Sequence, residues 1–165
     1  MSQQGEQFEG ERGFDFLLGT WEIAHRRLRR RFEQCHDWDE FESTAIVARV
    51  LRGLGIVDTY SCPDAPGGGF EALTLRLFDP ATGLWTTRWA SSTTPGRLDP
   101  PVQGAVSGGY ALLYGRDVHA GRPVAVRFEY RAGPDGSTVR WEQAFSADGE
   151  RTWEVNWTMD WRRTH

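Results

Sequence analysis

The chain has 165 residues and a formal net charge of −4, with 39% hydrophobic and 25% charged residues. These values are typical of one globular domain and exclude an intrinsically disordered chain. All 19 basic residues are arginine, because the sequence contains no lysine, so a mechanism that needs a lysine amine is excluded. The mild acidity and the single basic run, Arg26–Arg31, predict that nucleic acid is not a partner.

The N-terminal residues are polar and acidic, so we expect a flexible segment over residues 1–13, followed by one domain over residues 14–165. This segment has no apolar stretch of the kind that a secretory signal needs, and no later run is long enough to span a membrane. Cys35 and Cys62 are expected to be free thiols. The sequence therefore predicts a cytoplasmic protein with no membrane partner.

Ten segments rich in Val, Ile, Thr and aromatic residues follow one another, with turn residues between them at the spacing of β-strands. Asp135-Gly136 and Asp148-Gly149 suit tight hairpins, and Asp79–Gly83 suits a longer one. The expected strands are Thr20–Phe32, Glu40–Leu51, Gly55–Ser61, Phe70–Phe78, Trp85–Ser92, Val102–Ser107, Tyr110–Tyr114, Pro123–Arg131, Ser137–Phe145 and Thr152–Trp161.

So many strands joined by short turns predict an all-β fold, a single antiparallel up-and-down barrel of about ten strands. A meander of this length closes on itself because closure removes the exposed edges of the sheet.

Alternation along the strands predicts an aromatic interior. In the last strand Trp153, Val155, Trp157, Met159 and Trp161 share one face, and Glu154, Asn156, Thr158 and Asp160 share the other. These rings either fill a core or line a cavity, and a barrel of this size has more interior than side chains tend to fill. We therefore expect a small-molecule site lined by the inward residues Trp85, Thr87, Trp89, Tyr130, Trp141, Gln143 and Trp157.

The two ends of the barrel chain are expected to meet. Gly19-Thr20-Trp21 opens the first strand, and Arg162-Arg163 ends the last. If these strands pair in antiparallel fashion, an arginine comes close to the Trp21 ring and a cation–π contact becomes available. Trp21, Arg162 and Arg163 are therefore predicted to close one end of the barrel.

Several segments resemble an uncharacterised bacterial family of calycin-like, or lipocalin-like, barrels. They are Phe14–Glu22, Leu98–Val102, Gly121–Pro123, Arg127-Phe128 and, most closely, Arg140–Ser146, Asp148-Gly149, Thr152–Trp157 and Met159-Asp160. The resemblance implies a lipocalin-like fold and no assigned activity. Nitrobindin-type barrels are a more distant likeness, and they bind haem through a histidine late in the chain. The only late histidine here is the terminal His165, so we expect neither haem nor another cofactor.

The first strand carries the strongest charge feature. Alternation places His25 and Arg27 on the face of Trp21, where they could fix a carboxylate or an enolate, whereas a bulge or a strong twist would turn Arg27 outward. The cluster Cys35–Glu40 fits no standard zinc spacing, so no metal site is expected.

The first functional hypothesis is a binding protein that carries or sequesters a small, largely apolar or aromatic molecule. The alternative is an enzyme that uses the same cavity for cyclisation, isomerisation or dehydration, with His25, Arg27, Tyr130 or Glu142 as acid–base or anion-stabilising groups. A second alternative is a non-catalytic interaction protein, and a homodimer is kept open. The catalytic residues, if there are any, stay unknown at this point.

Overall fold

The computed structural model describes residues 10–164, in which two 3-10 turns accompany eleven strands. The turns are η1 (Asp15–Leu17) and η2 (Leu51–Gly53). The strands are β1 (Gly19–Leu28), β2 (Trp38–Val50), β3 (Gly55–Cys62), β4 (Phe70–Asp79), β5 (Leu84–Ser91), β6 (Val102–Gly104), β7 (Val106–Ser107), β8 (Tyr110–His119), β9 (Arg122–Ala132), β10 (Thr138–Ser146) and β11 (Glu154–Arg163).

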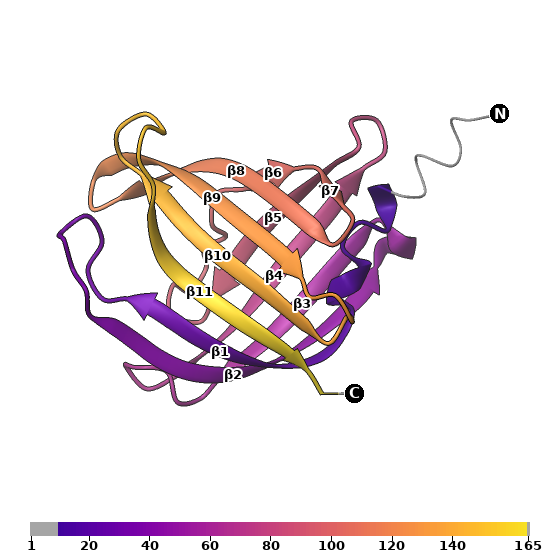
Figure 1. Cartoon of the computed structure of the whole chain (residues 1–165), viewed down its shortest axis with the longest axis horizontal. Helices are drawn as coiled ribbons and strands as arrows, with labels where there is room; N and C mark the ends of the chain where they lie inside the picture. Colours follow the sequence, from indigo (N-terminus) through magenta and orange to yellow (C-terminus); the bar gives the residue numbers. More distant parts are fainter. Residues whose placement is uncertain (1–9, 165) are drawn as a thin grey trace.

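The strands form one closed antiparallel barrel (Figure 1). β1 pairs with β2 on one side and with β11 on the other, and the strands pair in chain order from β2 to β6 and from β7 to β11. The short β6 pairs with both β5 and β8, which closes the ring, and β7 is an additional strand beside β8. The predicted all-β, single antiparallel up-and-down barrel of about ten strands is confirmed.

The strand boundaries differ most from those expected in three places, and elsewhere by one or two residues. β1 ends at Leu28 because the chain then turns, with positive φ angles at Phe32 and Gln34. β8 continues to His119 because it pairs with β9 along its whole length. The expected strand Val102–Ser107 is divided at Ala105, since only its first part pairs with β5.

One bulge changes which residues of β11 face inward. Gln143 pairs with Trp157 but the next residue, Ala144, pairs with Val155, so β11 holds one extra residue at this point. Because of this extra residue, the alternation of inward and outward side chains before the bulge is out of step with the alternation after it. The predicted shared face is therefore wrong for Trp153 and Val155: Val155 opposes Ala144, which does not line the cavity as its neighbours Gln143 and Phe145 do, and Trp153 packs beside exposed Tyr114.

The chain before β1 closes one end of the barrel, where η1 and η2 lie in Figure 1. The Trp21 indole Nε1 donates to the Leu17 carbonyl at 2.8 Å, and the Arg163 guanidinium lies 4.2 Å from the centre of the Trp21 ring. Arg163 also donates to the carbonyls of Phe16 and Leu18. Arg162 instead points outward and pairs with Glu22, so only Arg163 covers Trp21.

Most of the segment predicted to be flexible, residues 1–9, lies outside the described residues, as does His165. From Gly10 onward the chain packs against the barrel, because the Gly10 carbonyl accepts a hydrogen bond from Trp85 Nε1 at 2.8 Å.

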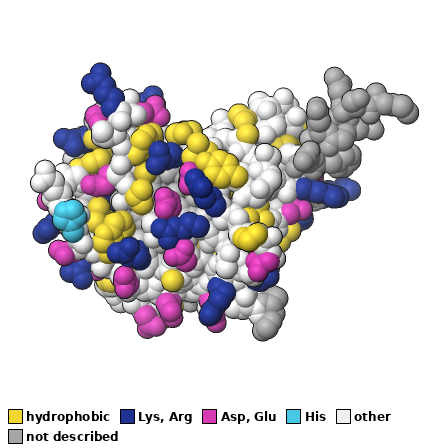
Figure 2. Space-filling view, in the orientation of Figure 1, with side chains coloured by type: hydrophobic (Ala, Val, Ile, Leu, Met, Phe, Trp, Pro, Cys, Tyr) yellow, Lys and Arg dark blue, Asp and Glu magenta, His cyan; other side chains and the backbone are white. Residues whose placement is uncertain are grey.

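The outer surface mixes the two charge signs. Figure 2 shows basic and acidic side chains interspersed with apolar ones over the visible face. Ion pairs on the outer faces of the strands join Arg140 to Asp160 and Arg26 to Glu40. None of the helical segments in residues 10–164 has the length and apolarity needed to cross a membrane.

Candidate functional site

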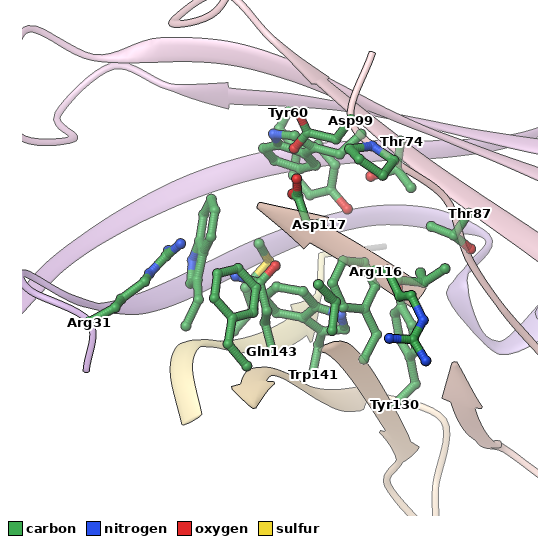
Figure 3. A pocket seen from close by; sticks show the side chains of 18 of the residues that line it. Arg31, Tyr60, Thr74, Thr87, Asp99, Arg116, Asp117, Tyr130, Trp141 and Gln143 are labelled. Atoms are coloured by element: carbon green, nitrogen blue, oxygen red, sulfur yellow. The ribbon is translucent and has the colours of Figure 1, made fainter. Parts of the chain in front are cut away.

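A cavity of about 150 Å³ lies inside the barrel, between the closed end and the loops at the opposite end, which we call the mouth. Its walls are mostly aromatic, with polar groups at the two ends (Figure 3). Of the residues predicted to form the site, the lining contains Thr87, Trp89, Tyr130, Trp141, Gln143 and Trp157.

The aromatic walls are held by edge-to-face packing. The Trp157 ring lies 5.6 Å from Trp89 and 5.9 Å from Trp141, at interplanar angles of 78° and 80°. Phe128 packs on Trp141 in the same way, at 5.1 Å and 77°. Edge-to-face contacts of this kind are favourable and fix ring orientation, so the aromatic walls are preorganised without a ligand.

The end of the cavity away from the mouth, which we call the floor, rests on a buried ion pair. Arg76 and Asp58 are both fully buried and form a salt bridge. The Tyr60 hydroxyl donates to Asp58 at 2.6 Å, and Arg76 Nη2 donates to the Tyr130 hydroxyl at 3.0 Å. Burial is the largest single effect on Arg76 and disfavours its charge, but the Asp58 carboxylate, Tyr130 and Tyr60 together outweigh burial and raise the pKa of the guanidinium.

This arrangement leaves a hydrogen-bond donor at the floor. Burial raises the pKa of Tyr130, so its hydroxyl stays protonated at neutral pH. Because this oxygen already accepts from Arg76, its own proton can be donated to another group. Sequence reasoning missed Asp58, Tyr60 and Arg76, although alternation with the inward Ile56 marks Asp58 and Tyr60 as facing the interior.

Three polar atoms of the lining have no hydrogen-bond partner among residues 10–164. They are Thr87 Oγ1, Trp141 Nε1 and Trp161 Nε1, and all three are buried. A buried polar atom without a partner costs roughly 1–3 kcal/mol, so a ligand group or a water that pairs with it is stabilised there. The cavity is therefore lined mostly by apolar surface and can form hydrogen bonds at these few polar atoms.

His25 faces inward but does not line the cavity. Its Nδ1 accepts a hydrogen bond from Trp157 Nε1 at 3.1 Å, and its Nε2 lies 2.7 Å from Ser43 Oγ. The Trp157 donor fixes the proton on Nε2, which donates to Ser43. Burial, with a smaller contribution from Arg27, lowers the pKa of His25 to about 3, so the ring is neutral and both nitrogens are engaged.

Arg27 also faces inward and is half-buried. Its guanidinium lies 5.2 Å from the centres of the Phe41 and Trp157 rings and 5.8 Å from that of Phe70. Arg27 forms no ion pair with a carboxylate in residues 10–164, and the aromatic rings supply cation–π contacts instead. Arg27 is not among the residues that line the cavity, but it contacts Trp157, which is.

Two further residues considered from the sequence lie away from the cavity. Trp85 is fully buried at the closed end, between Phe14 and Phe78. Glu142 forms an ion pair with Arg140 on the outer face of β10, so it cannot serve as an acid or a base in the cavity.

Charged side chains surround the mouth. Arg31, Asp99, Asp117 and the exposed Arg116 all belong to the cavity lining. The bulge in β11 also turns Glu154 inward, where its carboxylate accepts the Phe32 backbone N–H at 2.9 Å. Alternation along the expected strand Thr20–Phe32 puts Arg31 on the face of Trp21, but β1 ends at Leu28, so Arg31 reaches the lining from the turn beyond the strand.

In the described part of the chain, no three histidine, cysteine or acidic side chains gather closely enough to hold a metal ion. The fold and the cavity together define a closed β-barrel with an internal, aromatic-lined space, a form compatible with ligand binding. No family model matches the sequence, and no curated protein is significantly similar to it.

Proposed function

We propose that the protein binds a small molecule with a single aromatic ring inside the barrel, as a carrier or a means of sequestration. The observation that carries this proposal is the cavity itself, whose walls are fixed tryptophan and phenylalanine rings and whose volume is about 150 Å³. A dry cavity of about this volume in another protein accommodates benzene. A haem macrocycle is far larger than this space.

The polar atoms of the cavity support a ligand that carries one hydroxyl or carbonyl group. The Tyr130 hydroxyl can donate, and Thr87 Oγ1 can donate or accept. Both lie at the side of the pocket opposite Arg31 in Figure 3. A para-substituted phenol would place its hydroxyl there and its ring between the indoles.

Binding of this kind is favoured over the enzymatic alternative by the state of the candidate catalytic groups. His25 has both nitrogens bonded to protein, and Glu142 lies outside the barrel. The resemblance to calycin-like barrels, the cytoplasmic location and the homodimer remain proposals. The contact of Arg163 with Trp21 supports the first of these.

Isothermal titration calorimetry with p-cresol tests the proposal. At about −0.6 kcal/mol per non-hydrogen atom, within the range found for small ligands, its eight atoms give about −5 kcal/mol, or a Kd of about 0.2 mM. Val126 is buried and lines the cavity, so Val126→Phe should fill part of the space and weaken binding at least tenfold.

The matched control is Val118→Phe, which makes the same change at an exposed position on the neighbouring strand β8. This variant should bind p-cresol as the wild type does, and circular dichroism should show both variants folded. No detectable binding of p-cresol to the wild type, or equal binding by the two variants, would overturn the proposal.

A further inference from the structure

The mouth of the cavity carries opposite charges on its two sides. In Figure 3 Arg31 lies at one side of the cavity and the carboxylates of Asp99 and Asp117, which act on each other electrostatically, lie apart from it. These three side chains line the same space, together with a fourth charged side chain, Arg116, which is exposed to solvent. A ligand whose ring enters the cavity would therefore present its outer end to both charges.

Arg31 is a cation without an ion-pair partner among the carboxylates of residues 10–164. Its guanidinium lies 4.9 Å from the centre of the Phe145 ring, and burial lowers its pKa, with a further contribution from the like charge of Arg27. Glu154 and Asp117 act on it electrostatically, but the Glu154 carboxylate is bonded to the backbone of Phe32. A planar guanidinium in this state suits a carboxylate, which it can hold through two parallel hydrogen bonds.

The opposite side carries the carboxylates of Asp99 and Asp117, whose negative charge is only partly balanced by nearby arginine. Burial raises the pKa of Asp99, and the nearby Asp117 carboxylate acts in the same direction. Arg97 is the basic residue that contacts both, at 3.6 Å and 3.9 Å, and its side chain is 56% exposed. Long contacts of an exposed arginine contribute little. Asp117 Oδ1 accepts the Val118 backbone N–H at 2.7 Å, so a cation here would find one oxygen of Asp117 and the carboxylate of Asp99 still able to accept a hydrogen bond.

We propose that the ligand is a zwitterionic amino acid with one aromatic ring, bound with its carboxylate on Arg31 and its ammonium on Asp99 and Asp117. This inference rests on the proposed function, because the ring has to occupy the cavity. Arg31 and Asp117 act on each other electrostatically but do not form an ion pair. A carboxylate and an ammonium on one carbon would fill the space between them, and a ring hydroxyl would reach the floor.

Four probes with the same phenol ring but different charged groups test the contribution of each charge by itself. They are p-cresol, tyramine with only the ammonium, 3-(4-hydroxyphenyl)propanoate with only the carboxylate, and L-tyrosine with both. L-Tyrosine should bind at least tenfold more tightly than p-cresol, by about 1.4 kcal/mol. The two singly charged probes should fall between them, and the affinity of L-tyrosine should decrease as salt is added.

Two variants should each weaken the binding of a different pair of probes. Arg31→Gln should weaken L-tyrosine and 3-(4-hydroxyphenyl)propanoate at least tenfold but not tyramine. Asp117→Asn should weaken L-tyrosine and tyramine but not 3-(4-hydroxyphenyl)propanoate. Arg30→Gln and Asp64→Asn change exposed residues in loops at the same end of the barrel, and they should leave all four affinities unchanged.

The outcomes separate the two proposals. If p-cresol binds and L-tyrosine binds no more tightly, or if both variants affect all probes alike, the amino-acid inference is wrong and the ring site stands. If none of the four probes binds, both proposals are wrong. Arg31→Lys keeps the positive charge, and it should retain most of the preference for the carboxylate if Arg31→Gln acts through charge and not through misfolding.

Discussion

At the scale of single residues, His25 shows how burial fixes a protonation state. Its ring stacks on Phe41 at 4.5 Å and is bonded to Trp157 and Ser43, so protonating it would put a charge in an apolar site. The unfolded chain binds this proton near pH 6.5, and the folded chain binds it near pH 3. Between these values the unfolded state holds more protons, so the free energy of unfolding falls as the pH falls.

We therefore predict that His25→Gln is less sensitive to acid than the wild type. Between pH 7 and pH 4.5 the wild type should lose about 2–3 kcal/mol more than the variant, because each pH unit in this window is worth up to about 1.4 kcal/mol. Glutamine keeps one acceptor and one donor for Trp157 and Ser43. Urea unfolding of both proteins at the two pH values measures the difference, and equal losses would show that His25 binds its proton normally.

At the scale of elements, the closure of the barrel depends on a close approach of β6 to β8. A Cβ added to Gly104 would lie 2.2 Å from the Leu112 carbonyl oxygen, and one added to Gly115 would lie 2.3 Å from that of Pro101. Both contacts are with backbone, which cannot move aside without opening the pairing that closes the ring. Glycine is needed at these two positions because the strands lie so close together.

Gly104→Ala is accordingly predicted to lower the free energy of unfolding by at least about 1–3 kcal/mol, the usual cost of overpacking. Gly68→Ala serves as the comparison, since its added Cβ would meet no atom within 4 Å and the only cost comes from its positive φ angle. Chemical denaturation of the two variants should show the larger loss for Gly104→Ala. A loss no greater than that of Gly68→Ala would mean that the strands can separate at little cost.

The elements also show what the sequence could and could not predict. Alternation correctly indicated that Trp141 and Gln143 face the interior, because β10 is regular as far as Gln143. It failed at Asn156, which is fully buried and bonded to Gln143, because an extra residue in β11 leaves no sign in an alternating pattern. Arg31 falls on the face of Trp21 by alternation over the expected strand Thr20–Phe32, but β1 ends at Leu28, so its place in the lining depends on the turn that follows, where side-chain direction has no simple period.

At the scale of the whole molecule, the chemical character of the interior changes along the barrel axis. The closed end is sealed by Trp21 and Arg163, the floor holds the ion pair of Arg76 and Asp58, and the middle is walled by indoles. The mouth then carries Arg31 and the acidic pair. Polar and charged groups thus lie at the two ends of an apolar middle, as expected for a site that recognises a ring with polar substituents at opposite ends.

The most direct test of the proposed ring site is a crystal structure of the protein soaked with 4-bromophenol, because bromine can be located by its anomalous scattering. One bromine peak is predicted inside the barrel among Trp89, Trp141 and Trp157, and it should be absent from crystals of Val126→Phe. Peaks found only on the outer surface, or no peak in crystals soaked at several times the Kd measured for p-cresol, would contradict the proposal that this cavity binds an aromatic ring.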